Sequence, residues 1–149
     1  MALRDKLLSM AQAFLTSFNK FTPESVVAYR STSCKHHLLP ATLRAPPRSN
    51  AEYAAFVKQL QAVMPSFHLR LSEDEDPVVD EVTRTVVMHL KSHSETDVGL
   101  YENEYIWILK FNRTGTAIDK VIEFADSQYT AEWIPKFQKA IEDNQKPKT

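Results

Sequence analysis

The 149-residue chain is long enough to bury one hydrophobic core and too short for two of ordinary size, so we expect a single domain over residues 1–149. Its formal net charge of -1 at pH 7 predicts no nucleic-acid or anionic-membrane surface, and no apolar run is long enough to span a bilayer. A lone cysteine excludes an internal disulfide framework and favours a cytoplasmic location. Glycine occurs only at Gly99 and Gly115, which excludes a Rossmann fingerprint or a P-loop, because both bring several glycines against phosphates.

The N-terminal half of the sequence has helical patterns. Apolar residues spaced three and four apart predict an amphipathic helix over residues 2–19. A threonine–proline pair then predicts a short second helix over residues 23–30. Three prolines favour an irregular segment over residues 31–48. A third helix, over residues 49–64, opens with a serine and, three residues on, a glutamate, which is the pattern of a capping box.

The C-terminal half changes to the alternating and β-branched patterns of strands. A hairpin turn is expected at residues 112–115, and a closing helix from about Thr130. Helices followed by a strand meander and a last helix predict the α+β class, with helices covering an antiparallel sheet. The expected strands cover residues 67–71, 82–90, 100–111 and 116–125.

The last two expected strands carry acidic residues that could act together. The four-residue turn is expected to set Phe111 opposite Thr116, and Glu104 then faces Glu123 across the hairpin. Two carboxylates in a partly apolar pocket repel each other and lose hydration, which raises at least one pKa and suits general acid–base chemistry. Alternatively, both glutamates are solvated on an exposed face, and a one-residue slip in register would separate them.

The histidines and the cysteine do not form a recognisable metal site. His89 and His93 are four residues apart on an expected strand, roughly 13 Å, which is too far to chelate one ion. Cys34 and His36 lack a second ligand pair at the spacing of structural zinc sites. His36 is therefore expected either to carry protons in a pocket or to have a hydrogen-bonded structural role.

Two further charged residues have more than one possible role. Asp126 ends the last expected strand, where it could cap the next turn or lie at the rim of a pocket. Arg30 ends the expected second helix, where it could hold an anionic group of a substrate or pair with Glu104 or Glu123.

Three short motifs, together with the order of elements, carry a resemblance that covers essentially the whole chain. The motifs are CKHHLLP at residues 34–40, GLYENEY at residues 99–105 and EFADS at residues 123–127. The sequence resembles the SnoaL-like branch of the nuclear transport factor 2-like superfamily. Within that branch it is similar to the small fungal proteins encoded with polyketide and meroterpenoid pathways.

The resemblance implies a cone-shaped α+β barrel, in which N-terminal helices plug a cavity wrapped by a strongly curved antiparallel sheet and a C-terminal helix follows. It also implies a homodimer packed through the sheet, and catalysis without a metal or organic cofactor. In epoxide hydrolases of the superfamily an acid stands three residues before a terminal aspartate, a spacing that Glu123 and Asp126 match. Glu102 and Glu104 replace the arginine–acid pair of the adjacent strand, which argues against an epoxide-hydrolase mechanism.

The resulting hypothesis is a cofactor-independent isomerase, cyclase or dehydratase that uses acid–base chemistry on a polyketide- or meroterpenoid-derived intermediate. Its alternatives are a non-catalytic dimeric module that binds a ligand or another protein, and a pericyclase acting mainly through the shape of its pocket. No metal site is expected. The expected catalytic residues are Glu104, Glu123, His36 and Asp126, and the expected substrate contacts are Arg30, Tyr29, Asn103, Tyr105 and His89.

Overall fold

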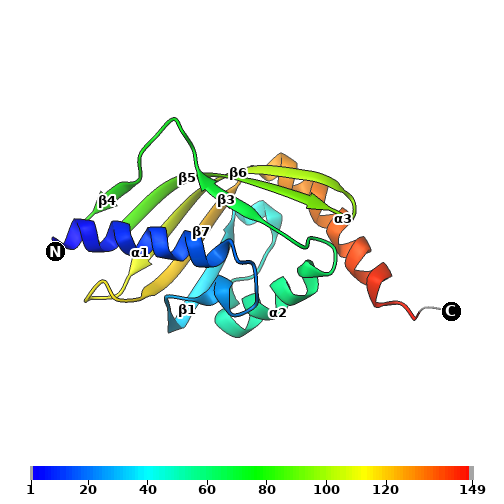
Figure 1. The fold of residues 1–149 in the computed structure, drawn as a ribbon, viewed down its shortest axis with the longest axis horizontal. Coiled ribbons are helices and arrows are strands. Elements are labelled where there is room, and N and C mark those ends of the chain that lie inside the picture. Colours follow the sequence, from blue (N-terminus) through cyan, green and yellow to red (C-terminus); the bar gives the residue numbers. More distant parts are fainter. Residues whose placement is uncertain (1, 148–149) are drawn as a thin grey trace.

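The computed structural model describes residues 2–147, which form helices packed on one strongly curved sheet (Figure 1). The strand order is β2-β1-β7-β6-β5-β3, with β4 pairing beside β5, so the sheet is open and does not close into a barrel. This arrangement confirms the predicted α+β cone. The strands are β1 (Arg30–Leu39), β2 (Arg48–Ser49), β3 (His68–Leu71), β4 (Val78–Asp80), β5 (Thr85–Thr96), β6 (Gly99–Phe111) and β7 (Ile118–Ala125).

The helices cover the inner face of the sheet. In Figure 1, α1 lies across the strands, and α3 is at the opposite end of the molecule from the N-terminus. No helix in the described part of the chain is long and apolar enough to cross a membrane. The α-helices are α1 (Leu3–Phe18), α2 (Asn50–Gln61) and α3 (Ser127–Gln145), and the 3-10 helices are η1 (Ser25–Val27) and η2 (Ala41–Leu43).

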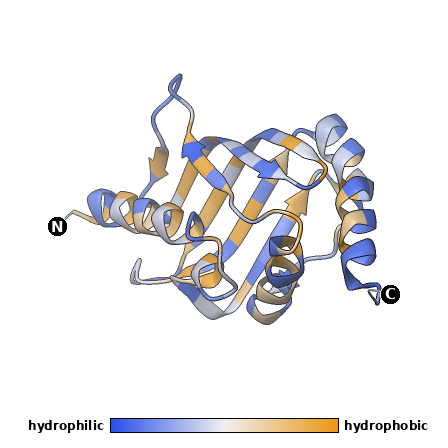
Figure 2. Cartoon of the chain, turned by 45° about the vertical axis from the view of Figure 1, so that its right-hand side comes forward, coloured by the Kyte–Doolittle hydropathy of each residue, from blue (hydrophilic) through white to orange (hydrophobic). Residues whose placement is uncertain are grey.

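The apolar stripe of α1 forms one wall of the core, as its spacing predicts. Leu7, Phe14 and Phe18 are almost completely buried, and Phe18 meets the Trp107 ring edge-to-face at 5.3 Å between centroids. Along β6 the odd-numbered residues from Tyr101 to Phe111 are buried, whereas their even-numbered neighbours are partly or fully exposed. Figure 2 shows this alternation as changing colours along the strands. The inner face of the sheet is therefore apolar enough to enclose a cavity.

The structure corrects the predicted register of the β6–β7 hairpin. Trp107, not Glu104, is the cross-strand partner of Glu123. The side chain of Asn112 accepts hydrogen bonds from the backbone N–H groups of Thr116 and Ala117, and the backbone N–H of Asn112 donates to the carbonyl of Ala117. The chain therefore reverses over a longer loop than expected, and an irregularity between Lys110 and Phe111 brings the total shift of the pairing to three residues. An odd shift moves every side chain of one strand to the other face of the sheet.

The segment after α1 also differs from the sequence prediction. Residues 31–48, which were expected to be irregular, contain most of the ten-residue strand β1. The prolines of this segment all follow the strand and therefore do not interrupt it. β1 pairs in parallel with β7, so the sheet is mixed rather than wholly antiparallel. The expected helix over residues 23–30 is only the 3-10 helix η1. The capping box of the next helix is confirmed, with reciprocal bonds between Ser49 and Glu52.

A side-chain amide fastens the end of α1 to the edge strand β3. Asn19 donates from Nδ2 to the carbonyl of Leu69 and accepts the N–H of Leu69 at Oδ1, both at 2.8 Å.

We expect Asn19→Ala to lower the free energy of unfolding by roughly 1–3 kcal/mol, because both backbone groups of Leu69 lose their partner. Urea denaturation measures the change. Thr16→Ala, in an exposed turn of α1, is the control and should change stability by less than about 0.5 kcal/mol; equal losses would contradict the role of Asn19.

Candidate active site

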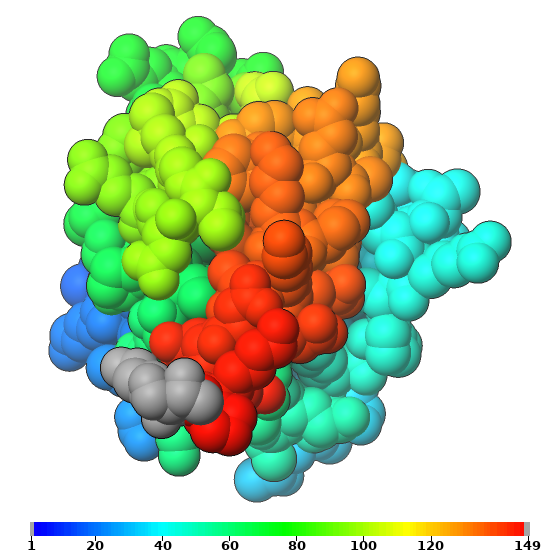
Figure 3. Space-filling model, turned by 90° about the vertical axis from the view of Figure 1, so that its right-hand side faces the viewer, coloured from blue at the N-terminus to red at the C-terminus, as the bar shows by residue number. Residues whose placement is uncertain are grey.

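A cavity of about 300 Å³ lies between the inner face of the sheet and the three α-helices. Its volume is at the lower end of the range for small-molecule sites. Figure 3 shows the end of the molecule where α3, in red and orange, packs beside α2 and the segment after β1. Most of the lining side chains are apolar. Those with polar groups on the cavity wall include His36, Arg48, Tyr53, Tyr101, Tyr105, Glu123 and Thr130.

A row of three charged or titratable side chains crosses this part of the molecule. Arg30 and His36 come from β1, and Glu123 comes from β7, the parallel neighbour of β1. Arg30 Nη1 lies 3.1 Å from His36 Nδ1, and His36 Nε2 lies 2.8 Å from Glu123 Oε1. His36 is only 3% exposed, and its ring stacks on Tyr53 at 4.2 Å with an interplanar angle of 12°. The structure therefore brings together three residues that the sequence singled out.

The arginine decides where the histidine carries its proton. A guanidinium can only donate hydrogen bonds, so His36 Nδ1 must accept from Arg30 and carry no proton. The proton of the neutral ring is then on Nε2, which donates to Glu123 Oε1. Burial and, next, the charge of Arg30 lower the pKa of His36 well below its usual value. His36 is thus a neutral donor of fixed tautomer.

Arg30 is held at some energetic cost. Its guanidinium stacks over the rings of Tyr53 at 4.9 Å and Phe14 at 5.6 Å. Its Nε and Nη2 atoms are buried and have no hydrogen-bond partner within residues 2–147. Burial lowers the pKa of Arg30, while nearby groups including Glu123 partly offset this effect. Buried donors without a partner are uncommon in folded proteins, because each one loses its hydrogen bonds to water.

Glu123 is the group in this row that can exchange a proton near neutral pH. Burial raises its pKa to about 7, against the opposing charges of Arg30 and Arg48. Its Oε1 accepts from His36, whereas Oε2 has no hydrogen-bond partner in the described part of the chain. The side chain is 17% exposed and lines the cavity. A carboxyl group in this state can act as a base or as an acid toward a molecule in the cavity.

Two tyrosines form a second polar feature on the cavity wall. Asn103 Nδ2 donates to the Tyr101 hydroxyl at 2.7 Å, and the Tyr101 and Tyr105 hydroxyls are 3.5 Å apart. Ser92 Oγ lies 2.9 Å from the Tyr105 hydroxyl. Burial raises the pKa of Tyr101 to about 12 and that of Tyr105 well above its usual value. Both phenols are therefore neutral at physiological pH and can donate to a substrate oxygen.

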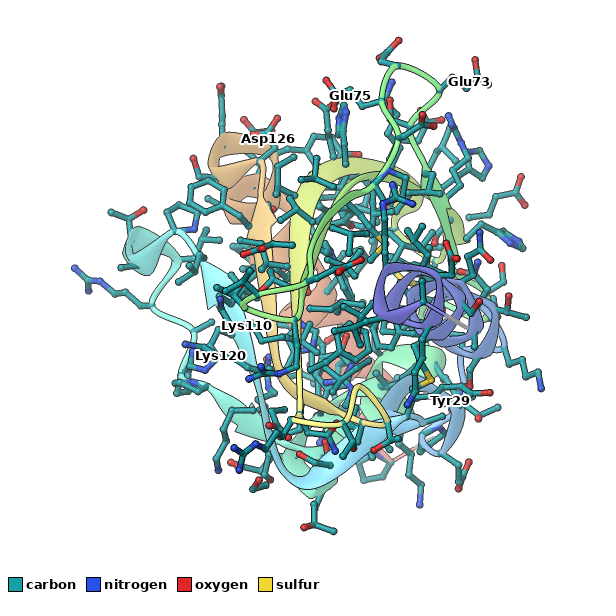
Figure 4. The ribbon with its side chains drawn as sticks, turned by 90° about the vertical axis from the view of Figure 1, so that its left-hand side faces the viewer. Tyr29, Glu73, Glu75, Lys110, Lys120 and Asp126 are labelled. Atoms are coloured by element: carbon teal, nitrogen blue, oxygen red, sulfur yellow. The ribbon has the colours of Figure 1, made fainter. Side chains whose placement is uncertain are left out.

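The structure does not place all the expected residues at the cavity. Because of the shifted register, Glu104 lies on the outer face of the sheet and bonds to His89 at 2.6 Å, so the expected Glu104–Glu123 pair is wrong. Asp126 is the N-cap of α3, where its carboxylate accepts the N–H of Tyr129. Tyr29 is 45% exposed. Figure 4 shows Tyr29 and Asp126 at opposite ends of the molecule.

Several cavity residues were not among the expected site residues. Tyr53 is a buried residue of α2, and Tyr101 is a buried residue of β6 between exposed neighbours, so helical and strand periodicity are the signals that could have found them. Arg48 had no such signal, because it falls in the segment predicted to be irregular. Asn103 is buried and holds Tyr101 and Thr130 without lining the cavity. Within residues 2–147, no three His, Cys, Asp or Glu side chains are placed to hold a metal ion.

On the outer face, His89 joins the acidic loop between β3 and β4 to the sheet. Its Nδ1 lies 3.0 Å from Glu75 Oε2, and its Nε2 lies 2.6 Å from Glu104 Oε2. Both ring nitrogens face carboxylates, which favours the doubly protonated ring. The hydrogen bond to Glu104 is the largest cause of a raised His89 pKa, and the charges of both glutamates add to it. Glu75 is labelled in Figure 4.

This contact predicts a pH-dependent contribution to stability. A histidine whose pKa is raised on folding stabilises the fold fully below its unfolded pKa of about 6.5 and loses that contribution as pH rises through the folded value. We expect His89→Gln to lower the unfolding free energy more at about pH 6 than at about pH 9, as measured by urea denaturation. His68→Gln, at an exposed position, is the control. The same loss at both pH values would contradict the paired imidazolium.

Comparisons with known proteins agree with this architecture. No family model matches the sequence. Austinoid biosynthesis clusters protein H of Penicillium brasilianum is 38% identical over 136 residues, which cover 91% of this chain and 92% of that protein. The crystal structure of the BvnE pinacolase from Penicillium brevicompactum aligns with a TM-score of 0.88 at 42% identity, covering 93% and 94% of the two chains.

A solved structure of much lower sequence identity has the same fold as this chain. A SnoaL-like protein from Shewanella denitrificans aligns with a TM-score of 0.69 at 11% identity, covering 87% of this chain and 97% of that one, which shows a shared fold alone. Protein H and the BvnE pinacolase are each more than 30% identical to this chain, over alignments that cover nearly all of it. The chain therefore belongs to the family of fungal proteins that includes austinoid biosynthesis clusters protein H and the BvnE pinacolase, and it has the fold of SnoaL-like proteins.

Proposed function

We propose that the protein is a cofactor-independent isomerase or cyclase of secondary metabolism, in which Glu123 moves a proton on a polyketide- or meroterpenoid-derived intermediate. The observation that carries this proposal is the state of Glu123, whose pKa of about 7 belongs to a carboxyl group with one oxygen held by His36 and the other free in an apolar cavity. The names of the relatives, an austinoid cluster protein and a pinacolase, support the same general class.

The proposed proton transfer uses the unpartnered oxygen of Glu123. As a carboxylate, Oε2 takes a proton from a carbon next to a carbonyl or from a hydroxyl, and the resulting acid returns it at another position. His36 keeps its own proton and stabilises the carboxylate through Nε2–H, since Arg30 occupies Nδ1. Arg30 is therefore a positioning residue that acts through His36. The apolar walls bind the carbon skeleton and exclude water from the intermediate.

The tyrosine pair supplies the complementary donors. Negative charge that develops on a substrate oxygen, or on an oxygen that leaves, needs a neutral donor in a site of low polarity. Tyr101 already accepts from Asn103, so its own proton is free to turn toward a substrate. In a rearrangement of the pinacol type, one hydroxyl takes up a proton and leaves as water, a substituent migrates from the neighbouring carbon to the carbon left behind, and the hydroxyl on that neighbouring carbon loses its proton and becomes a carbonyl. Glu123 and the tyrosines together provide an acceptor and donors for such a step.

Removing the acid of Glu123 tests the proposal directly. The substrate is the metabolite that accumulates when the gene is deleted in its host, and purified protein should convert it. We expect Glu123→Gln to lower kcat/KM by at least about 100-fold, because the amide keeps the shape but cannot take up a proton. Glu104→Gln is the matched control on the outer face and should retain the wild-type rate. Retained activity in Glu123→Gln would indicate a pericyclase, and no conversion by the wild type would indicate a non-catalytic module.

The pH profile of the wild type adds a second readout to that experiment. We expect kcat/KM to change with an inflection near pH 7, the pKa of Glu123. A rate that rises with pH assigns Glu123 as the base, and a rate that falls assigns it as the acid. A flat profile through this range would contradict proton transfer by Glu123.

The outer face of the sheet supports a further proposal, that the protein is a homodimer. Ile106 and Phe124 are cross-strand partners on this face and are 38% and 48% exposed. Ile108 and Ile122 are partners one step further along the same face. We propose that a second copy of the chain covers this apolar surface, as the family resemblance implies.

A charge at the centre of this surface should disrupt the dimer. We expect the wild type to sediment as a dimer and Phe124→Glu as a monomer of unchanged circular dichroism, because a buried, unpaired carboxylate at the interface is costly. The control is Val82→Glu, a highly exposed apolar residue before β5, which should leave the dimer intact. A monomeric wild type would contradict the proposal.

A further inference from the structure

Arg48 is an unpaired cation beside the proposed proton-transfer residue. It belongs to the two-residue strand β2, which pairs antiparallel with β1, and its Cα partner is His36. Directly opposed residues share a face of the sheet, with Cβ atoms roughly 5 Å apart. Arg48 therefore lines the cavity on the same side as the His36–Glu123 pair.

The guanidinium of Arg48 is oriented but not neutralised. It lies over the ring of Phe56, a cavity residue of α2, at 4.1 Å from the centroid. Stacking on a ring uses the face of the guanidinium and leaves its N–H groups, which point outward in the plane, free to donate. Within residues 2–147 the side chain of Arg48 makes no hydrogen bond and no ion pair. Arg30, in contrast, donates to His36.

The charges around the cavity leave Arg48 without a protein partner. Among the described residues that line it, Glu123 is the one carboxyl group, and its Oε1 is already bonded to His36. The other cation on the lining, Arg44, is exposed to solvent. A half-buried guanidinium with free donors in an apolar cavity is a site for an oxygen atom of high negative charge.

We propose that Arg48 binds an anionic oxygen of the substrate, a carboxylate or the oxygen of an ionised dicarbonyl, attached to an apolar skeleton. The planar N–H groups match the two oxygens of such an anion. The skeleton then extends into the apolar cavity and passes Glu123 Oε2. This inference rests on the proposed function only in taking the cavity to be the substrate site, because it names the group that anchors the substrate and not the chemistry.

Binding of a matched pair of probes tests the inference without any turnover. Naphthoate and naphthamide have the same skeleton and differ in charge, and isothermal titration calorimetry measures the affinity of each. We expect naphthoate to bind wild-type protein about tenfold more tightly than naphthamide. In Arg48→Met, which keeps an unbranched side chain on Phe56, the difference should fall to within about twofold. In Arg48→Lys it should be intermediate, because the charge remains and the planar fork is lost.

The control is Arg113→Met, which removes an exposed arginine from the turn after β6 and should leave the preference for naphthoate intact. Unchanged circular dichroism of Arg48→Met shows that the variant is folded. Equal binding of the two probes by the wild type, failure to bind naphthoate, or a preference that survives in Arg48→Met would overturn the inference. The two proposals can fail independently. Full activity of Glu123→Gln would contradict the proposed role of Glu123, and the preference of the wild type for naphthoate would still support the role of Arg48.

Discussion

The candidate site depends on one contact, in which a buried arginine donates to a buried histidine. Because Arg30 Nη1 lies 3.1 Å from His36 Nδ1, the histidine is neutral and carries its proton toward Glu123. The pKa of Glu123 is then set mainly by burial, and the cations that oppose this effect act without touching the carboxylate. If the arginine were absent, His36 could become an imidazolium beside Glu123, which would stabilise the carboxylate and lower its pKa.

The fold buries the contact between Arg30 and His36 by packing segments that are far apart in the sequence around it. β1 enters the sheet beside β7, which sets His36 diagonally across from Glu123. α2 lays Tyr53 flat against the imidazole, while Trp107 of β6 meets the same ring edge-on at 5.3 Å. The site is thus assembled from four elements whose inner faces are apolar. His36 and Glu123 are bonded to each other, and Glu123 also faces the cavity, which is the arrangement expected where an internal acid must stay reactive.

Much of the fold could be predicted from the sequence, because local patterns decide it. The spacing of apolar residues identified α1, and the serine–glutamate pair identified the start of α2. The hairpin register could not be predicted in this way. It depends on Asn112, whose side chain binds backbone groups four and five residues ahead, and on an irregularity of the pairing between Lys110 and Phe111. β1 was missed because its main partner, β7, pairs with residues 85 to 88 positions earlier in the chain, and a parallel pairing leaves no local pattern.

The same distinction applies to the candidate site. His36, Glu123 and Arg30 could be selected by residue type, and they do lie together. Glu104 was selected by a register that the turn does not allow, and Arg48 was missed because the strand that carries it is only two residues long. Composition and motif thus identify reactive residues, whereas the geometry of a turn decides which of them share a face. His89 and Glu104 illustrate the same effect, because both were expected at a pocket, and they instead join the loop that carries Glu75 to the outer face of the sheet.

The central claim is that Arg30 holds His36 as a neutral donor toward Glu123. Nitrogen-15 NMR of protein labelled at histidine reports the protonation of each ring nitrogen separately. For His36 we expect Nε2 protonated and Nδ1 unprotonated throughout the range from about pH 6 to about pH 8, because burial and the adjacent arginine keep its pKa below that range. A spectrum at neutral pH in which both nitrogens of His36 carry protons, or in which the proton is on Nδ1, would contradict it.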